Sequence, residues 1–210
     1  MITLYWNPQI RAARMFWGLA EIGQPYELVP IDIRDAGRTD PPGFLAASPL
    51  RKVPALSDGD LHMADSAAIA LYLADRYAPG DLAPLPDDPA RGEFLTWLFY
   101  TPSAIEPAMT EKFAKLEPNP AAYPWGSFDR MLEAIETRLD GRDWLAAGRF
   151  TMADFMVASA LDFMRRFNML QPSQRVADYI ARCTSRPAAQ EGARKLQEAT
   201  DALQAAAAKG

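Results

Sequence analysis

The sequence predicts two domains of different class, a small α/β domain over residues 1–78 and an all-α domain over residues 88–210. In the first part, short segments of strand-forming residues and helical segments follow one another, whereas every later segment has helical periodicity and none alternates. Between the two parts, residues 79–90 hold four prolines and three aspartates. This composition is typical of a linker, which we place at residues 79–87.

The α/β domain is expected to start with a strand over residues 2–6 and a helix over residues 11–22, where apolar side chains recur at helical spacing. Gly23 and then Pro25 end this helix as a C-cap glycine followed by a proline should. A second strand covers residues 26–31. Because strand, helix and strand are joined by a right-handed crossover, the two strands should be parallel.

The rest of the domain is expected to contain a hairpin, signalled by Asp58-Gly59. The other expected elements are a helical turn over 43–47, strands over 54–56 and 61–63, and a helix over 67–77. The resulting order β-α-β-α-β-β-α is the thioredoxin-like arrangement.

The all-α domain is expected to begin with one long helix over residues 91–115, kinked near Pro102 and Pro107. Thr151 with Asp154 three residues later is a variant of the capping box and predicts a helix start there. The other helices are expected over residues 128–139, 155–167, 175–184 and 187 to roughly 205.

Composition excludes several classes of protein. Apolar residues make up 49% and charged residues 23%, as in soluble globular proteins, and the net charge of −5 without a basic cluster argues against nucleic acid as a partner. No run approaches the roughly 18 apolar residues of a membrane span, and no signal peptide is apparent. The single Cys183 excludes an internal disulfide, and His62 has no partner for a metal site. We therefore expect a cytoplasmic protein without a metal.

The stretch most informative about function is Lys52-Val53-Pro54-Ala55-Leu56, followed by Asp65-Ser66 in front of an apolar helix. Proline has no N–H for a sheet ladder and allows a cis bond, so Pro54 belongs at the start or edge of a strand, where neighbouring backbone groups are exposed. Asp65 and Ser66 are good capping residues, and a helix N-terminus attracts anions. Together these features can hold a small peptide-like anion.

This combination and its spacing resemble the glutathione transferase family, whose glutathione-binding half reads K-V-P-x-L and then [DE]-S before an apolar helix. The resemblance covers essentially the whole chain. It implies that glutathione is the co-substrate and that the Ser66 hydroxyl and N–H hold its α-carboxylate while Asp65 pairs with its ammonium group. The alternative is that Asp65 and Ser66 only cap the helix.

The same resemblance implies that the backbone of Val53 pairs with the cysteinyl unit of glutathione and that Pro54 holds this backbone open. Lys52 and Arg51 are the nearest cations for the glycine carboxylate. Lys52 matches the residue usual in the family, whereas Arg51 stands where glycine is common. For both cations the alternative is a solvated loop charge.

Catalysis in this family requires a lower pKa of the bound thiol, because an unperturbed thiol of pKa about 8.5 is only about 3% ionised at neutral pH. Family members donate a hydrogen bond from a Tyr, Ser or Cys just after the first strand. Here the loop over residues 6–11 contains none of these. The candidate donors are the Asn7 amide, then Tyr5, which stands on the strand and more often packs in such a position, and finally backbone N–H groups alone.

The family resemblance further implies an acceptor site for a small hydrophobic electrophile, lined by the helix after the linker, and a homodimer. Ile10, which stands where serine or cysteine is frequent and cannot donate, is assigned to this site. The helical positions assigned to it are Phe99, Ser103, Glu106 and Thr110. Because the usual donor hydroxyl is missing, a glutathione-binding or scaffold protein with little or no turnover is the alternative function.

Overall fold

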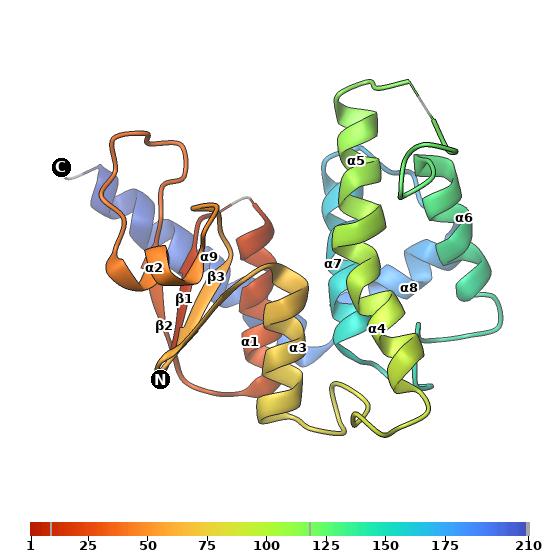
Figure 1. Cartoon of the computed structure of the whole chain (residues 1–210), viewed down its shortest axis with the longest axis horizontal. Coiled ribbons are helices and arrows are strands. Elements are labelled where there is room, and N and C mark those ends of the chain that lie inside the picture. The colour runs from red at the N-terminus through yellow and green to blue at the C-terminus, as the bar shows by residue number, and fades with distance from the viewer. Residues whose placement is uncertain (9, 118, 209–210) are drawn as a thin grey trace. The chain divides into compact units, whose positions relative to one another are not determined.

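The computed structural model of the protein describes residues 1–8, 10–117 and 119–208. The chain divides into two compact units, one formed by Met1–Tyr77 with the C-terminal segment that starts at Arg186, the other by Ala78–Ser185. The first unit combines a four-stranded sheet with helices, and the second is helical (Figure 1). The predicted fold class, a thioredoxin-like α/β domain followed by an all-α domain, is confirmed.

The sheet of the first unit has the strand order β2-β1-β3-β4. Its central strand β1 pairs in parallel with β2, as the strand–helix–strand order predicts, and antiparallel with β3. Strands β3 and β4 form the hairpin at Asp58-Gly59, where Gly59 has φ of +59°. The strands span Ile2–Trp6 (β1), Tyr26–Pro30 (β2), Ala55–Asp58 (β3) and Leu61–Ala64 (β4).

Helices cover both faces of this sheet (Figure 1). Trp6 packs edge-on against Phe16 of α1, with ring centroids 4.9 Å apart, so alternate residues of β1 face α1. Tyr5 faces α2 on the other side, where a Cβ on Gly43 would lie 2.2 Å from the Tyr5 hydroxyl oxygen. The helices are α1 (Met15–Ile22), which follows a 3-10 turn at Arg11–Arg14, α2 (Pro42–Ala47) and α3 (Ser66–Tyr77).

The C-terminal helix α9 (Pro187–Ala207) packs on α1, in the same unit as the sheet. A Cβ on Gly192 would lie 2.5 Å from the Trp17 Cα, so only glycine allows the two helices to approach this closely. The guanidinium of Arg186 donates to both carboxylate oxygens of Glu21, at 2.7 and 2.8 Å. The sequence predicts this helix in the domain over residues 88–210, because periodicity identifies an amphipathic helix without identifying its packing partner.

The second unit is built around α7, most of whose residues are buried and which contacts α4 and α8. The capping box at its start is confirmed: Thr151 accepts from the Ala153 N–H, and Asp154 accepts from the Thr151 N–H. In the described part of the chain, no helix has both the length and the apolar character needed to cross a membrane. The helices are α4 (Arg91–Tyr100), α5 (Glu106–Phe113), α6 (Phe128–Arg138), α7 (Met152–Arg166) and α8 (Gln174–Thr184).

The long helix predicted over residues 91–115 is interrupted where its prolines lie. One turn of π-helix at Thr101–Ile105 separates α4 from α5. Pro102 and Pro107 have no N–H to donate to the carbonyl one turn earlier. The helix therefore widens to a π-helix for one turn and then continues as α-helix.

The proline-rich residues before α4 are packed and belong to the second unit. Leu82 and Ala83 are buried, the Leu82 carbonyl accepts from the Met152 N–H at 2.8 Å, and the Pro84 carbonyl accepts from Arg91 at 2.6 Å. The sequence analysis expected a linker over residues 79–87. The composition of residues 79–87 predicts a segment without helix or strand, as the structure has it. A segment without helix or strand can still pack against the rest of its unit.

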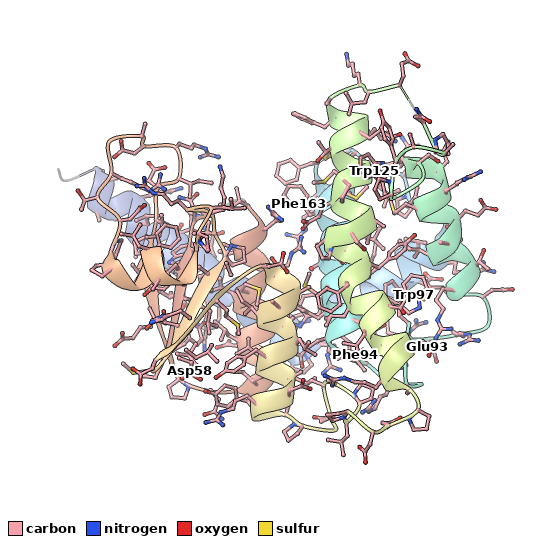
Figure 2. The ribbon with its side chains drawn as sticks, in the orientation of Figure 1. Asp58, Glu93, Phe94, Trp97, Trp125 and Phe163 are labelled. Atoms are coloured by element: carbon pink, nitrogen blue, oxygen red, sulfur yellow. The ribbon has the colours of Figure 1, made fainter. Side chains whose placement is uncertain are left out.

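Asp58 lies at the end of the sheet where the chain begins (Figure 2). Its Oδ2 accepts from the Tyr72 hydroxyl at 2.9 Å and from the Tyr77 hydroxyl, and its Oδ1 lies 3.6 Å from the N-terminal ammonium of Met1. The hydrogen bond from Tyr77 above all lowers the pKa of Asp58, while burial and this carboxylate raise the pKa of Tyr72 to about 12. These contacts join α3 to the β3–β4 hairpin, so Asp58, Tyr72 and Tyr77 have a structural role.

Candidate functional site

The segments that the sequence assigns to glutathione binding converge at the opposite end of the sheet. Tyr5 of β1 pairs with Ala55 of β3, and Ala55 pairs with Ala64 of β4. The loop after β1, the Val53-Pro54 segment before β3 and the Asp65-Ser66 segment after β4 therefore all leave the sheet at one end. Strand register alone brings them together.

The Val53-Pro54 segment has the backbone geometry that the motif predicts. The peptide bond between them is cis, and β3 starts directly afterwards at Ala55. Within the described residues, the N–H and C=O groups of Val53 make no hydrogen bond, although Val53 is only 5% exposed. This backbone edge can therefore pair with an added extended peptide.

At the start of α3, Asp65 caps the helix while Ser66 leaves its polar groups unused. Asp65 is exposed, with φ of +77°, and its Oδ1 accepts from the N–H groups of Ala67 and Ala68 at 2.8 and 3.2 Å. Ser66 is 3% exposed, and its Oγ has no hydrogen-bond partner among the described residues. The Ser66 N–H is the first of the helix, where no preceding turn offers an acceptor. A buried hydroxyl and an N–H thus remain available to an anion.

Two cations precede Val53, and they differ in how they are held. Arg51 donates from Nε to Oδ2 of Asp40 at 2.5 Å, and its φ of +53° lies in the region that favours glycine, the residue expected there from the family resemblance. The backbone N–H and C=O of Lys52 are both bonded to the Ser48 hydroxyl, at 2.9 and 2.7 Å. The Lys52 ammonium is exposed and makes no ion pair within the described residues.

The two candidate thiol donors are both buried and both have partners. Asn7 donates from Nδ2 to the Ile31 carbonyl at 2.9 Å, which ties the end of β1 to the residue after β2. One N–H of this amide remains, since Nδ2 carries two. The Tyr5 hydroxyl accepts from Ser57 Oγ at 3.3 Å and lies against Gly43 on the α2 face. The Tyr5 ring also packs against Phe44 of α2, with ring centroids 5.5 Å apart.

The residues assigned to the acceptor site lie in separate units. Ile10 is half-buried and precedes the 3-10 turn, where its carbonyl accepts from the Ala13 N–H at 2.8 Å. On the α4–α5 segment, Phe99 is 40% exposed, and Ser103 and Thr110 are exposed while Glu106 is half-buried. The hydroxyls of Ser103 and Thr110 donate to the carbonyls four residues earlier, at 2.6 and 3.0 Å.

Asp40 and Ser48, which no sequence pattern indicated, hold the loop that carries Arg51 and Lys52. Asp40 is 8% exposed and accepts from Arg38 and Arg51, and Ser48 is 2% exposed. Burial on its own raises the pKa of Asp40, but the hydrogen bonds and charges of Arg51 and Arg38 outweigh it and bring the pKa below its usual value. Neither residue carries a local signal for its contact with the two cations, because Arg51 lies 11 positions after Asp40 and Lys52 lies four positions after Ser48. Among the described residues, no group of three or more His, Cys, Asp and Glu side chains is placed to hold a metal ion.

Comparison with known proteins agrees with this geometry. A family model described as the glutathione S-transferase N-terminal domain matches residues 1–75, and one for the glutathione S-transferase C-terminal domain matches residues 120–182, so that together they match more than half of the chain. The chain belongs to the glutathione transferase family. The resemblance found in the sequence is thereby confirmed.

Individual members of the glutathione transferase family align over most of this chain. A glutathione S-transferase of Hyoscyamus muticus is 26% identical over 162 residues, which is 72% of this chain and 76% of that protein. The crystal structure of a glutathione transferase from Methylococcus capsulatus has a TM-score of 0.76 at 26% identity, covering 94% of this chain and 99% of the other. A sphingomonad glutathione S-transferase, solved in complex with glutathione, has a TM-score of 0.72 at 26% identity, covering 93% and 98%.

Proposed function

We propose that this glutathione transferase binds glutathione at the end of the sheet where β3 starts and adds its thiolate to a small hydrophobic electrophile. The observation that carries the proposal is the buried Ser66 hydroxyl, which has no hydrogen-bond partner among the described residues. An unpaired buried polar group costs about 1–3 kcal/mol, so a site that leaves one at a helix N-terminus is suited to an anionic ligand.

Each part of glutathione has a counterpart at this site. The α-carboxylate accepts from the Ser66 hydroxyl and N–H, and the ammonium group pairs with the Asp65 carboxylate, whose Oδ2 is not used in capping. The cysteinyl unit pairs with the Val53 backbone, which Pro54 leaves outside the ladder. Arg51 and Lys52 supply positive charge for the glycine carboxylate.

For the sulfur we propose the remaining N–H of the Asn7 amide as donor, with backbone N–H groups of the loop before α1 as further support. A hydrogen bond to the charged form of a thiol lowers its pKa. Tyr5 is the weaker candidate, because its side chain packs on the α2 face against Phe44 and Gly43. The electrophile would contact the α4–α5 segment, with Phe99, Ser103, Glu106 and Thr110, and the assignment of Ile10 to the acceptor site stays a prediction from the sequence. A homodimer and a cytoplasmic location are part of the same proposal.

The test has two stages. Calorimetric titration with glutathione should give saturable binding, and steady-state assays with a panel of electrophiles should give rates above the uncatalysed reaction. Binding without turnover would favour the alternative of a glutathione-binding or scaffold protein, and no binding would refute both. The ultraviolet absorbance of the bound thiolate against pH then compares donors: Asn7→Ala should raise the thiol pKa and lower kcat, whereas Tyr5→Phe should leave both unchanged.

A further inference from the structure

The loop between β2 and α2 contains a buried carboxylate that faces two arginines. The Asp40 side chain is 1% exposed; its Oδ1 accepts from Nε of Arg38 at 2.6 Å, and its Oδ2 accepts from Nε of Arg51 at 2.5 Å. A carboxylate this deeply buried is tolerated only when it is paired. Its two partners account for its ionisation, and its pKa is below the usual value.

Arg38 extends this cluster to the backbone on both sides. Its Nη1 donates to the carbonyls of Asp32 and Asp35 at 3.3 and 3.2 Å, and its Nη2 donates to the Arg51 carbonyl at 3.3 Å. The Arg51 N–H in turn donates to the Ser48 carbonyl at 2.9 Å. The backbone and the Nε edge of Arg51 are therefore both held in place.

The outer edge of Arg51 is left open by this arrangement. Its side chain is 54% exposed, and among the described residues its two Nη groups make no hydrogen bond. A guanidinium is planar, so fixing Nε also fixes the direction of the two terminal nitrogens, which form a fork that matches a carboxylate. The neighbouring Lys52 presents a flexible point charge without this preorganisation.

We propose that Asp40 is a positioning residue that orients Arg51 as the receptor for the glycine carboxylate of glutathione. This inference rests on the proposed function. Arg51, and not Lys52, is then the residue that binds the glycine carboxylate, although the family resemblance favours lysine. The buried ion pair orders the receptor before the ligand arrives, which lowers the ordering cost of binding.

The experiment compares glutathione with γ-glutamylcysteine, which lacks the glycine and its carboxylate. Dissociation constants of both ligands are measured by calorimetry for the wild type and for Asp40→Asn and Arg51→Ala, with Lys52→Ala for comparison. We expect both variants to weaken glutathione binding by about five- to tenfold and to leave γ-glutamylcysteine binding unchanged, because only the former ligand carries the carboxylate that Arg51 receives. The KM for glutathione should rise accordingly, with kcat at saturation unchanged.

Glu21→Gln is the matched control. Glu21 is also a buried carboxylate held by one arginine in the same unit, with its side chain 4% exposed, but it joins α1 to α9. This variant should lose stability without changing the ratio of the two affinities. Should Asp40→Asn not fold, as judged by circular dichroism, Arg51→Lys replaces it, because lysine keeps the charge but has no planar fork for Asp40 to orient; unchanged glutathione affinity in Arg51→Lys would overturn the inference.

Several outcomes would overturn the inference. Equal losses for the two ligands would make Asp40 a purely structural residue. A selective loss of glutathione binding in Lys52→Ala but not in Arg51→Ala would assign the carboxylate to Lys52. Absence of wild-type binding to either ligand would refute the proposed function itself, which is a different result from wild-type binding that the variants leave unaltered.

Discussion

The helices α3 and α7 begin with the same kinds of side chain, an aspartate and a hydroxyl, and use them in opposite ways. At α7, Thr151 and Asp154 are fully buried, and the carboxylate accepts from the N–H groups of Leu145 and Thr151, both at 2.9 Å, and from the Tyr179 hydroxyl at 3.1 Å. At α3, Asp65 is exposed and caps with one oxygen, while the buried Ser66 hydroxyl has no partner among the described residues.

Under the proposed function, the difference separates a helix start that serves folding from one that serves glutathione binding. A cap whose polar groups all find partners within the chain has nothing left for a ligand, and removing it leaves several buried donors unpaired. A cap that leaves a buried hydroxyl and an N–H unpaired lowers stability slightly and gains an anion site. Residue type does not distinguish the two; the completeness of the hydrogen bonds does.

The largest expected effect is on stability at α7. Asp154→Ala leaves two N–H groups and the Tyr179 hydroxyl without their acceptor, and we expect a loss of about 4 kcal/mol in the free energy of unfolding. Urea denaturation measures it. Asp65→Ala, the matched change at α3, removes an exposed cap and should cost only about 1 kcal/mol. Similar losses at the two sites would contradict the distinction.

The next effect is on the pH dependence of stability. Burial, which four hydrogen bonds oppose, raises the pKa of Asp154 to about 6. The folded protein therefore holds this proton more tightly than the unfolded chain, so the stability it contributes is present at low pH and is lost as the pH rises through about 6. Relative to Asp154→Asn, the free energy of unfolding of the wild type should fall by up to about 3 kcal/mol between about pH 4 and about pH 6. A difference that stays constant with pH, measured by urea denaturation, would disprove it.

A smaller effect, on binding, is expected at α3. Ser66→Ala should weaken glutathione binding by about tenfold, which corresponds to about 1.4 kcal/mol, through loss of the hydroxyl donor. Its free energy of unfolding should stay the same or rise by about 1 kcal/mol, because an unpaired buried hydroxyl is removed. Calorimetry measures the affinity and urea denaturation measures the free energy of unfolding. Thr151→Ala should show the reverse, lower stability with unchanged affinity.

The smallest effect is expected from Asp65→Asn. Asparagine caps a helix as well as aspartate and tolerates positive φ, so stability should change by no more than about 0.5 kcal/mol. Loss of the charge that pairs with the ligand's ammonium group should weaken glutathione binding by about threefold, and less at high salt. Asp60→Asn, in the exposed hairpin turn, is the control for a general charge effect. An equal loss of affinity in that variant would remove Asp65 from the site.

Local sequence patterns predicted most of the elements. Period-two and helical spacing, the Gly23 C-cap, the Asp58-Gly59 turn and the Thr151–Asp154 box each act within a few residues, so the chain carries their signal directly. The Val53-Pro54 and Asp65-Ser66 motif was recognisable for the same reason, because a proline before a strand and a cap before a helix are local features.

Contacts between distant residues decided the rest. The packing of α9 on α1 depends on Gly192 meeting Trp17, 175 positions apart in the sequence, and the periodicity of a helix does not name its partner. The contacts of Asp40 and Tyr5 likewise depend on distant residues, on Arg51 in one case and on Ser57 and Gly43 in the other. The motif was enough to indicate what kind of ligand the helix start could hold. Only the folded chain reveals that the Ser66 hydroxyl is buried without a partner among the described residues, because the completeness of a hydrogen-bond network is a property of three-dimensional packing.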